Sequence, residues 1–221
     1  MELAKELKQI NTYLDLKTNI LSIPNKMPVQ ITEGDSIFKE AITFLENLEP
    51  LEPLEWDKNL AKSAQYHVDD IGPKGCITFK SSDGTEAEDR ILRFGNYKQY
   101  IAENLCFGPN DAFDIIISLT LDDDEKTRDN RNHLFSKNFK KVGIGYGPHK
   151  TEFKVCVMDF ADEFIPLDEI KNRVNNIKSK TKELQSEKFS TYTNAQEEYF
   201  SNFCLIFILI LLISFIIMKF I

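Results

Sequence analysis

Apolar residues recur at helical spacing in four stretches of the chain. Side chains three or four residues apart share one face of a helix, so each stretch predicts an amphipathic helix. Asp35 can cap the second stretch and Pro50 ends it, and Asn110 or Asp111 can cap the fourth. The four predicted helices are residues 3–14, 35–48, 57–70 and 112–119.

Two later stretches predict β-strands. Residues 142–146 have the sequence VGIGY, and residues 153–160 alternate in a way that leaves neither side polar. Such a strand is typical of a sheet covered on both faces. Residues 147–150 are the expected hairpin loop. Because helices outnumber strands and precede them, we expect an α+β domain with helices packed on an antiparallel sheet.

The segment at residues 203–218 is uncharged and consists almost entirely of Leu, Ile and Phe. Large apolar residues favour a bilayer by about 0.3–0.6 kcal/mol each, and Lys219 can extend to the headgroups. We therefore expect one transmembrane helix at residues 203–221. A buried core helix and a GPI signal are the alternatives, but core helices are seldom apolar on every face, and a GPI signal needs an entry signal.

The start of the chain bears on topology. Residues 1–17 include Glu2 and Glu6 and lack the apolar core of a secretory signal. A membrane segment that emerges last is inserted after synthesis, so we expect a tail-anchored protein of the endoplasmic reticulum or connected membranes, with a cytosolic domain. A further signal sequence upstream would reverse that topology.

A helical stalk is expected between the domain and the anchor. Its apolar positions lie among Lys, Asn, Glu and Gln, which fits either a solvated helix or a weak coiled coil. The predicted organisation is an amphipathic helix and linker at residues 1–34, a globular domain at 35–166, a stalk and spacer at 167–202 and the anchor at 203–221.

Composition excludes several classes of protein. The net charge of −8 and the lack of a clustered basic stripe argue against a nucleic-acid partner. The four cysteines form no CxxC pair and the three histidines show no zinc-ligand spacing. We expect no disulfide framework and no cofactor.

Charged and glycine residues are concentrated in residues 122–149. An acidic run, a basic turn rich in amides and the strand VGIGY follow one another there. This arrangement suggests a site whose floor is made by a loop and a tight strand.

Several short motifs follow one another between residues 35 and 166. They are Trp56-Asp57, Ser82-Asp83-Gly84-Thr85, Asp89-Arg90-Ile91, Ala102-Glu103-Asn104-Leu105, Leu121-Asp122-Asp123, Val142-Gly143-Ile144-Gly145 and Asp159-Phe160-Ala161. Together they resemble the CAP superfamily, the SCP-like proteins that include cysteine-rich secretory, antigen 5 and pathogenesis-related proteins. The resemblance is to the protist and bacterial branches, and it implies an α-β-α sandwich.

The family's hallmark is a cleft with two histidines and two acidic residues, which holds a divalent cation in many members. The resemblance places Glu103 and Asp122 at the acidic positions, but Phe79 and Asn130 stand where the histidines belong. Two carboxylates without nitrogen donors bind zinc poorly, so we expect the metal site to be lost.

Other residues are candidates for the same cleft. A one-residue shift of the alignment would bring in His133. Asp123, Arg131 and His149 are candidates for its rim, although His149 could equally be a solvated loop residue.

Two functions are compatible with these residues. The preferred hypothesis is a non-catalytic binding module for a peptide, a protein or an apolar ligand, since family members have been linked to sterol and fatty-acid binding. The alternative is a peptidase-like hydrolase that uses Glu103 and Asp122 as a carboxylate pair, which requires a raised pKa in a dry cleft.

Overall fold

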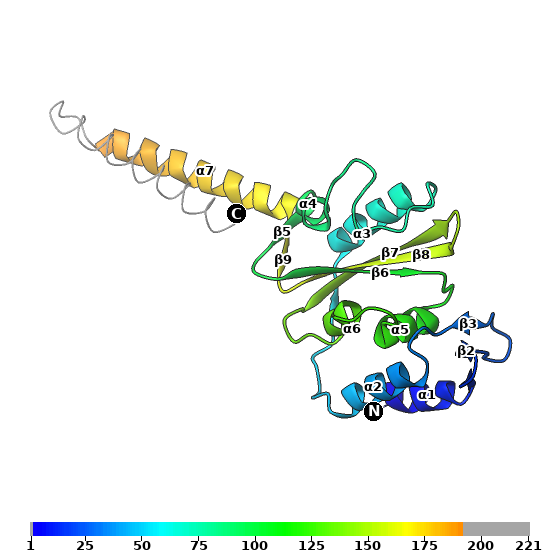
Figure 1. The fold of residues 1–221 in the computed structure, drawn as a ribbon. Coiled ribbons are helices and arrows are strands. Elements are labelled where there is room, and N and C mark those ends of the chain that lie inside the picture. Colours follow the sequence, from blue (N-terminus) through cyan, green and yellow to red (C-terminus); the bar gives the residue numbers. More distant parts are fainter. Residues whose placement is uncertain (1, 192–221) are drawn as a thin grey trace.

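A mixed four-stranded sheet is the centre of the molecule, as Figure 1 shows. The computed structural model describes residues 2–191, and side chains through residue 184. Strand order is β4-β7-β8-β6; the edge strand β4 runs parallel to β7 and the other pairs are antiparallel. The strands are β4 (Glu55–Trp56), β6 (Ile101–Phe107), β7 (Lys141–His149) and β8 (Phe153–Ala161).

Helices cover both faces of this sheet. In Figure 1, α3 (Lys58–Ile71) and α4 (Ala87–Leu92) lie on one side, and α5 (Ala112–Leu121) and α6 (Asp129–Leu134) on the other. The caps expected from the sequence form at two helices: the Asp57 carboxylate accepts from the amides of Asn59 and Leu60, and that of Asp111 accepts from Asp114. The two-sided cover confirms the α+β class and the buried second strand of the hairpin.

The glycines of β7 serve packing. Gly143 and Gly145 lie directly under the backbone of α3: a β-carbon on Gly143 would come 2.0 Å from the Ala61 nitrogen, and one on Gly145 would come 2.4 Å from the Gln65 nitrogen. The intervening Ile144 faces the core on the α5 side. The expected site floor at VGIGY is therefore occupied by a helix.

The N-terminal residues form a further layer. The helices α1 (Glu2–Asn11) and α2 (Asp35–Glu46) share one hydrophobic cluster that also includes Ile117 and Leu121 of α5. Ile115 and Leu119 of α5 pack instead toward the sheet, so α5 is buried on two sides. This is why its sequence is apolar almost all round.

The segment predicted as a linker contains secondary structure. A three-stranded sheet joins α1 to α2, and it consists of β1 (Leu14–Asp15), β2 (Ile20–Leu21) and β3 (Val29–Gln30). Gly34 occupies the N-cap position of α2, one residue before the expected Asp35. The Asp35 carboxylate instead accepts a hydrogen bond of 2.8 Å from the Asn11 side chain, and this bond helps hold α2 to α1.

A long helix leaves the domain at its C-terminal end. The helix α7 (Leu167–Thr191) follows the two-stranded sheet of β5 (Gly95–Tyr97) and β9 (Phe164–Pro166), and its first residues lie against those strands before it projects outward (Figure 1). Within residues 2–191 no helix has the length and apolar character needed to cross a bilayer. The predicted anchor at residues 203–221 lies outside the described residues.

Candidate functional site

Glu103 is held in a buried ion pair with Arg90. The Nη2 atom of Arg90, on α4, donates to both carboxylate oxygens of Glu103 at 2.7 and 2.6 Å. The Arg90 side chain is 0% exposed and that of Glu103 is 3% exposed. The Nη1 atom of Arg90 donates to the Ser81 hydroxyl and to the Thr85 carbonyl. Both oxygens of Glu103 are thus engaged and shielded from solvent.

His67 extends this network beneath the loop between α3 and α4. Its Nε2 lies 3.0 Å from the Thr78 carbonyl and its Nδ1 lies 3.4 Å from the Ser81 hydroxyl. Burial, together with the nearby Arg90 charge, lowers the pKa of His67 to about 4. The imidazole is therefore neutral at physiological pH, and it fixes the loop on α3.

Asp122 belongs to a second network, on the α5 and α6 side of the sheet. Its carboxylate accepts from the side chain of Asn130 at 2.8 Å and from the backbone amide of Arg131 at 3.2 Å. Asp122 ends α5 in the left-handed conformation. The acidic side chain thus anchors the start of α6.

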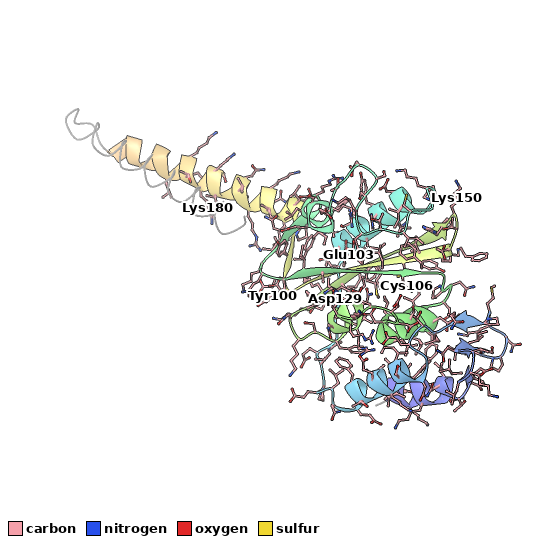
Figure 2. All side chains as sticks on the ribbon, viewed as in Figure 1. Tyr100, Glu103, Cys106, Asp129, Lys150 and Lys180 are labelled. Atoms are coloured by element: carbon pink, nitrogen blue, oxygen red, sulfur yellow. The ribbon has the colours of Figure 1, made fainter. Side chains whose placement is uncertain are left out.

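Strand alternation separates the two networks. Successive residues of a strand point to opposite faces of the sheet. Leu105, two residues from Glu103, packs against α3, whereas Cys106 packs against α5. Glu103 therefore faces the α3 and α4 layer (Figure 2). Its neighbour Asn104 faces α6, where its side chain contacts Asn130 and His133.

Asn104 is the β6 residue that joins the Asp122 network. Its Nδ2 donates to the Asn130 carbonyl at 2.9 Å, and its Oδ1 lies 2.8 Å from Nδ1 of His133. Asn104 was not among the site residues predicted from the sequence. Its position directly after Glu103 could have indicated its role. Adjacent residues of a strand point to opposite faces of the sheet, so if Glu103 points to one face, Asn104 must point to the other.

Of the four positions expected to share a cleft, Phe79, Glu103, Asp122 and Asn130, the structure brings Asp122 and Asn130 into contact with each other. Phe79 lies in the loop between α3 and α4 and is 52% exposed. Glu103 is on the other side of the sheet from Asp122. The physical reason is the two-residue period of β6, which directs its carboxylate away from α6.

The expected rim residues have structural partners. The Asp123 carboxylate accepts from the backbone amides of Thr32 and Glu33, which ties the loop after α5 to the N-terminal layer. His149 lies in the β7–β8 hairpin, where Nε2 is 3.1 Å from the Cys76 carbonyl and Nδ1 accepts from the Glu152 amide.

Arg131 and Arg128 complete the contact between α2 and α6. Arg131 is 2% exposed, and its Nη1 donates to Glu40 at 2.6 Å. Arg128 donates to Glu40 at 3.0 and 2.9 Å and to Glu33 at 2.6 Å. Hydrogen bonds from Arg128, and then from Arg131, lower the pKa of Glu40 to about 2. They outweigh partial burial, which by itself would raise this pKa. The N-terminal layer therefore closes over the loop that carries Asp122.

These residues do not fit a family-type metal centre. Among residues 2–184, no group of three or more His, Cys, Asp and Glu side chains is arranged to hold a metal ion. Glu103 and Asp122 lie on opposite faces of the sheet, and each already accepts hydrogen bonds from protein donors. Nor can they act as a catalytic carboxylate pair on one bound substrate in this arrangement.

The comparisons with known proteins define the class. The model of the CAP family, described as the cysteine-rich secretory protein family, matches residues 48–160, and the chain belongs to this family. The match begins after α2, so the N-terminal layer lies outside it. No curated protein matches the chain.

Two solved structures are similar at a low level. An outer surface protein from Borrelia burgdorferi is 19% identical, with a TM-score of 0.42 over 58% of this chain and 88% of that chain. An extracellular protein containing a SCP domain from Bacillus anthracis is 22% identical, with a TM-score of 0.39 over 64% of this chain and 44% of that chain. Both TM-scores lie below 0.5, so these likenesses add nothing to the family match.

Proposed function

We propose that this protein is a non-catalytic CAP domain that binds a peptide, a protein or an apolar ligand and is tethered to a membrane by residues 203–221. The observation that carries the first part is the engagement of both family acidic positions. Glu103 is paired with buried Arg90, and Asp122 is paired with Asn130. A general acid or base must be able to exchange a proton with substrate, and neither carboxylate is free to do so.

The hydrolase alternative has little support. Burial raises the pKa of Glu103 despite Arg90, which is the direction a general acid needs. However, the residue is only 7% exposed and both of its oxygens are taken by one guanidinium. A raised pKa in a side chain that substrate cannot reach gives no catalysis.

The surface beside α3 is the part of the domain that best fits ligand recognition. Ile77 and Phe79 are 62% and 52% exposed on the loop after α3. Phe79 also stands at a family histidine position, so an apolar ring replaces a polar donor there. We infer that this loop contributes the apolar contacts to the ligand.

The membrane tether is supported by the sequence of residues 203–218. This stretch is uncharged and consists almost entirely of Leu, Ile and Phe. Each large apolar residue favours a bilayer by about 0.3–0.6 kcal/mol, so the stretch as a whole favours insertion.

The binding proposal is tested with the full chain in detergent. Peptide and ester substrates should be hydrolysed at the buffer rate by both the wild type and Glu103→Gln. An environment-sensitive fluorescent fatty acid should bind, with at least about tenfold weaker affinity for Phe79→Ala, which corresponds to about 1.4 kcal/mol. Leu16→Ala is the control, because Leu16 is 69% exposed on the N-terminal layer. Hydrolysis that Glu103→Gln abolishes would instead establish the enzyme.

The tether has its own test. A tag at Met1 should be removed by protease added to sealed microsomes, while the chain stays with the membrane after alkaline extraction. Protection of the tag would place the domain on the luminal side, and release by alkali would refute the anchor.

A further inference from the structure

Asp159 lies next to Glu103 inside the molecule. The two residues are direct partners in the antiparallel pairing of β6 with β8. The Gly108 amide donates to the Lys154 carbonyl, so Gly108 and Lys154 form a pair joined by a backbone hydrogen bond. Such pairs recur at every second residue of an antiparallel ladder, and on β6 they therefore fall at the even-numbered residues. Glu103 and Asp159 therefore form a pair without backbone hydrogen bonds, where α-carbons are about 4.5 Å apart and side chains lie closest.

Asp159 is completely buried and has few donors near it. Its side chain is 0% exposed, and neither carboxylate oxygen makes a hydrogen bond of good geometry with another described residue. The Ser63 hydroxyl and the Arg90 Nε also lack such a bond within this part of the chain, although the Ser63 hydroxyl is near enough to lower the pKa of Asp159. An ionised carboxylate in such a place would lose its hydration and receive at most one hydroxyl in return.

The groups around Asp159 provide one positive charge for two carboxyls. β6 contributes Glu103, α4 contributes Arg90, and α3 contributes Ser63 together with the neutral His67, which the Arg90 charge reaches. On the remaining side β7 places Gly143 opposite Asp159, and this residue has no side chain. Arg90 already gives Nη2 to Glu103 and Nη1 to neutral oxygens of the loop before α4, so its charge is matched by Glu103 alone.

We propose that folding takes up one proton at neutral pH and that Asp159 holds it, as a neutral carboxylic acid beside the Glu103–Arg90 ion pair. The buried cluster then has no net charge. Burial is the main cause that raises the pKa of Asp159 well above its ordinary value, and the Glu103 charge raises it further. The same carboxyl, exposed to water in the unfolded chain, releases the proton.

The sign of the pH dependence follows. Because the folded pKa lies above the unfolded value of 3.8, the stabilising contribution of Asp159 is complete below 3.8 and is lost as pH rises through the folded pKa. His67 acts in the opposite sense, since its pKa of about 4 makes the unfolded chain take up a proton below 6.5. At about pH 8 an ordinary histidine is neutral in both states. Burial raises the pKa of Cys106 to about 11 and that of Cys156 to about 12, so these thiols also release part of a proton on unfolding. That part is common to the wild type and to a variant at Asp159, and it cancels in their comparison.

Calorimetric unfolding of the full chain in detergent tests the proposal. Unfolding enthalpies measured at about pH 8 in two buffers of different ionisation enthalpy give the number of protons released. The wild type should release about one proton more than Asp159→Asn, an isosteric variant that stays neutral. Equal proton release by the two proteins would overturn the proposal, because Asp159 would then be ionised in the folded state.

Infrared spectroscopy provides a measurement that needs no variant. The folded wild type at about pH 8 should show a carboxylic-acid carbonyl band that disappears on unfolding, and aspartate labelled with carbon-13 at the carboxyl should shift it. Absence of the band, or a band that the label leaves in place, would overturn the assignment to Asp159.

Discussion

The backbone of α3 passes so closely over β7 that Gly143 and Ala61 have no room for a side chain between them. A β-carbon on Gly143 would lie 2.0 Å from the Ala61 nitrogen and 2.2 Å from the Leu60 carbonyl carbon. This contact sets the height of α3 above the sheet. It therefore also sets the space in which Ser63, His67 and the Glu103–Asp159 pair are enclosed.

Gly143→Ala should destabilise the fold by about 3 kcal/mol, because the added carbon meets backbone atoms that cannot rotate away. Urea unfolding measures the change. Gly84→Asn is the control: a β-carbon at Gly84 meets nothing within 4 Å, and asparagine tolerates its φ of +86° better than other residues do. Equal losses in the two variants would show that glycine flexibility, rather than helix packing, is what matters.

Arg90→Met should destabilise the protein by about 3–5 kcal/mol near neutral pH, because it leaves the Glu103 carboxylate buried without its cation. The loss should shrink on acidification, when Glu103 can be protonated. Arg93→Met, on the turn after α4, is the matched control, since Arg93 is 43% exposed and stacks on Tyr66. A comparable loss for the two arginines in urea titrations would argue against the buried pair.

Restoring both family histidines should not restore a metal site. In a Phe79→His and Asn130→His double variant, the two carboxylates would still lie on opposite faces of the sheet. Calorimetric titration with zinc is expected to show no stoichiometric binding to the wild type or to the double variant. One zinc ion bound per chain of the variant would mean that Glu103 and Asp122 can reach a common point.

The contact of α2 with α6 should weaken in acid. The pKa of Glu40 is lowered to about 2, so its stabilising contribution is present above its ordinary value of 4.5 and is lost as pH falls toward 2. In urea titrations the difference between wild type and Glu40→Gln should thus narrow below about pH 4.5. Because Glu40 is 47% exposed, salt should narrow it too. A difference independent of pH would mean that Glu40 acts through packing.

Local patterns in the sequence predicted most of the helices and the β7–β8 hairpin. The helix caps at Asp57 and Asp111 were predicted because they depend on residues only two or three positions away. Strand β6 was missed, because Glu103 and Asn104 place two polar residues in the middle of a buried strand. Their partners, Arg90 and His133, are distant in sequence, and no periodicity signals them.

The sequence by itself determined the class of the protein, since the family match rests on residues 48–160 alone. The resemblance to that family also predicts Phe79 and Asn130 at the positions of its two histidines, and this prediction requires no coordinates. Only the tertiary structure decided what the acidic residues do, because charge pairing depends on contacts across the sheet. Glu103 lies with Arg90 and Asp159 because side chains alternate along β6 and because α3 packs closely on Gly143. Asp122 contacts Asn130 on the other face of the sheet.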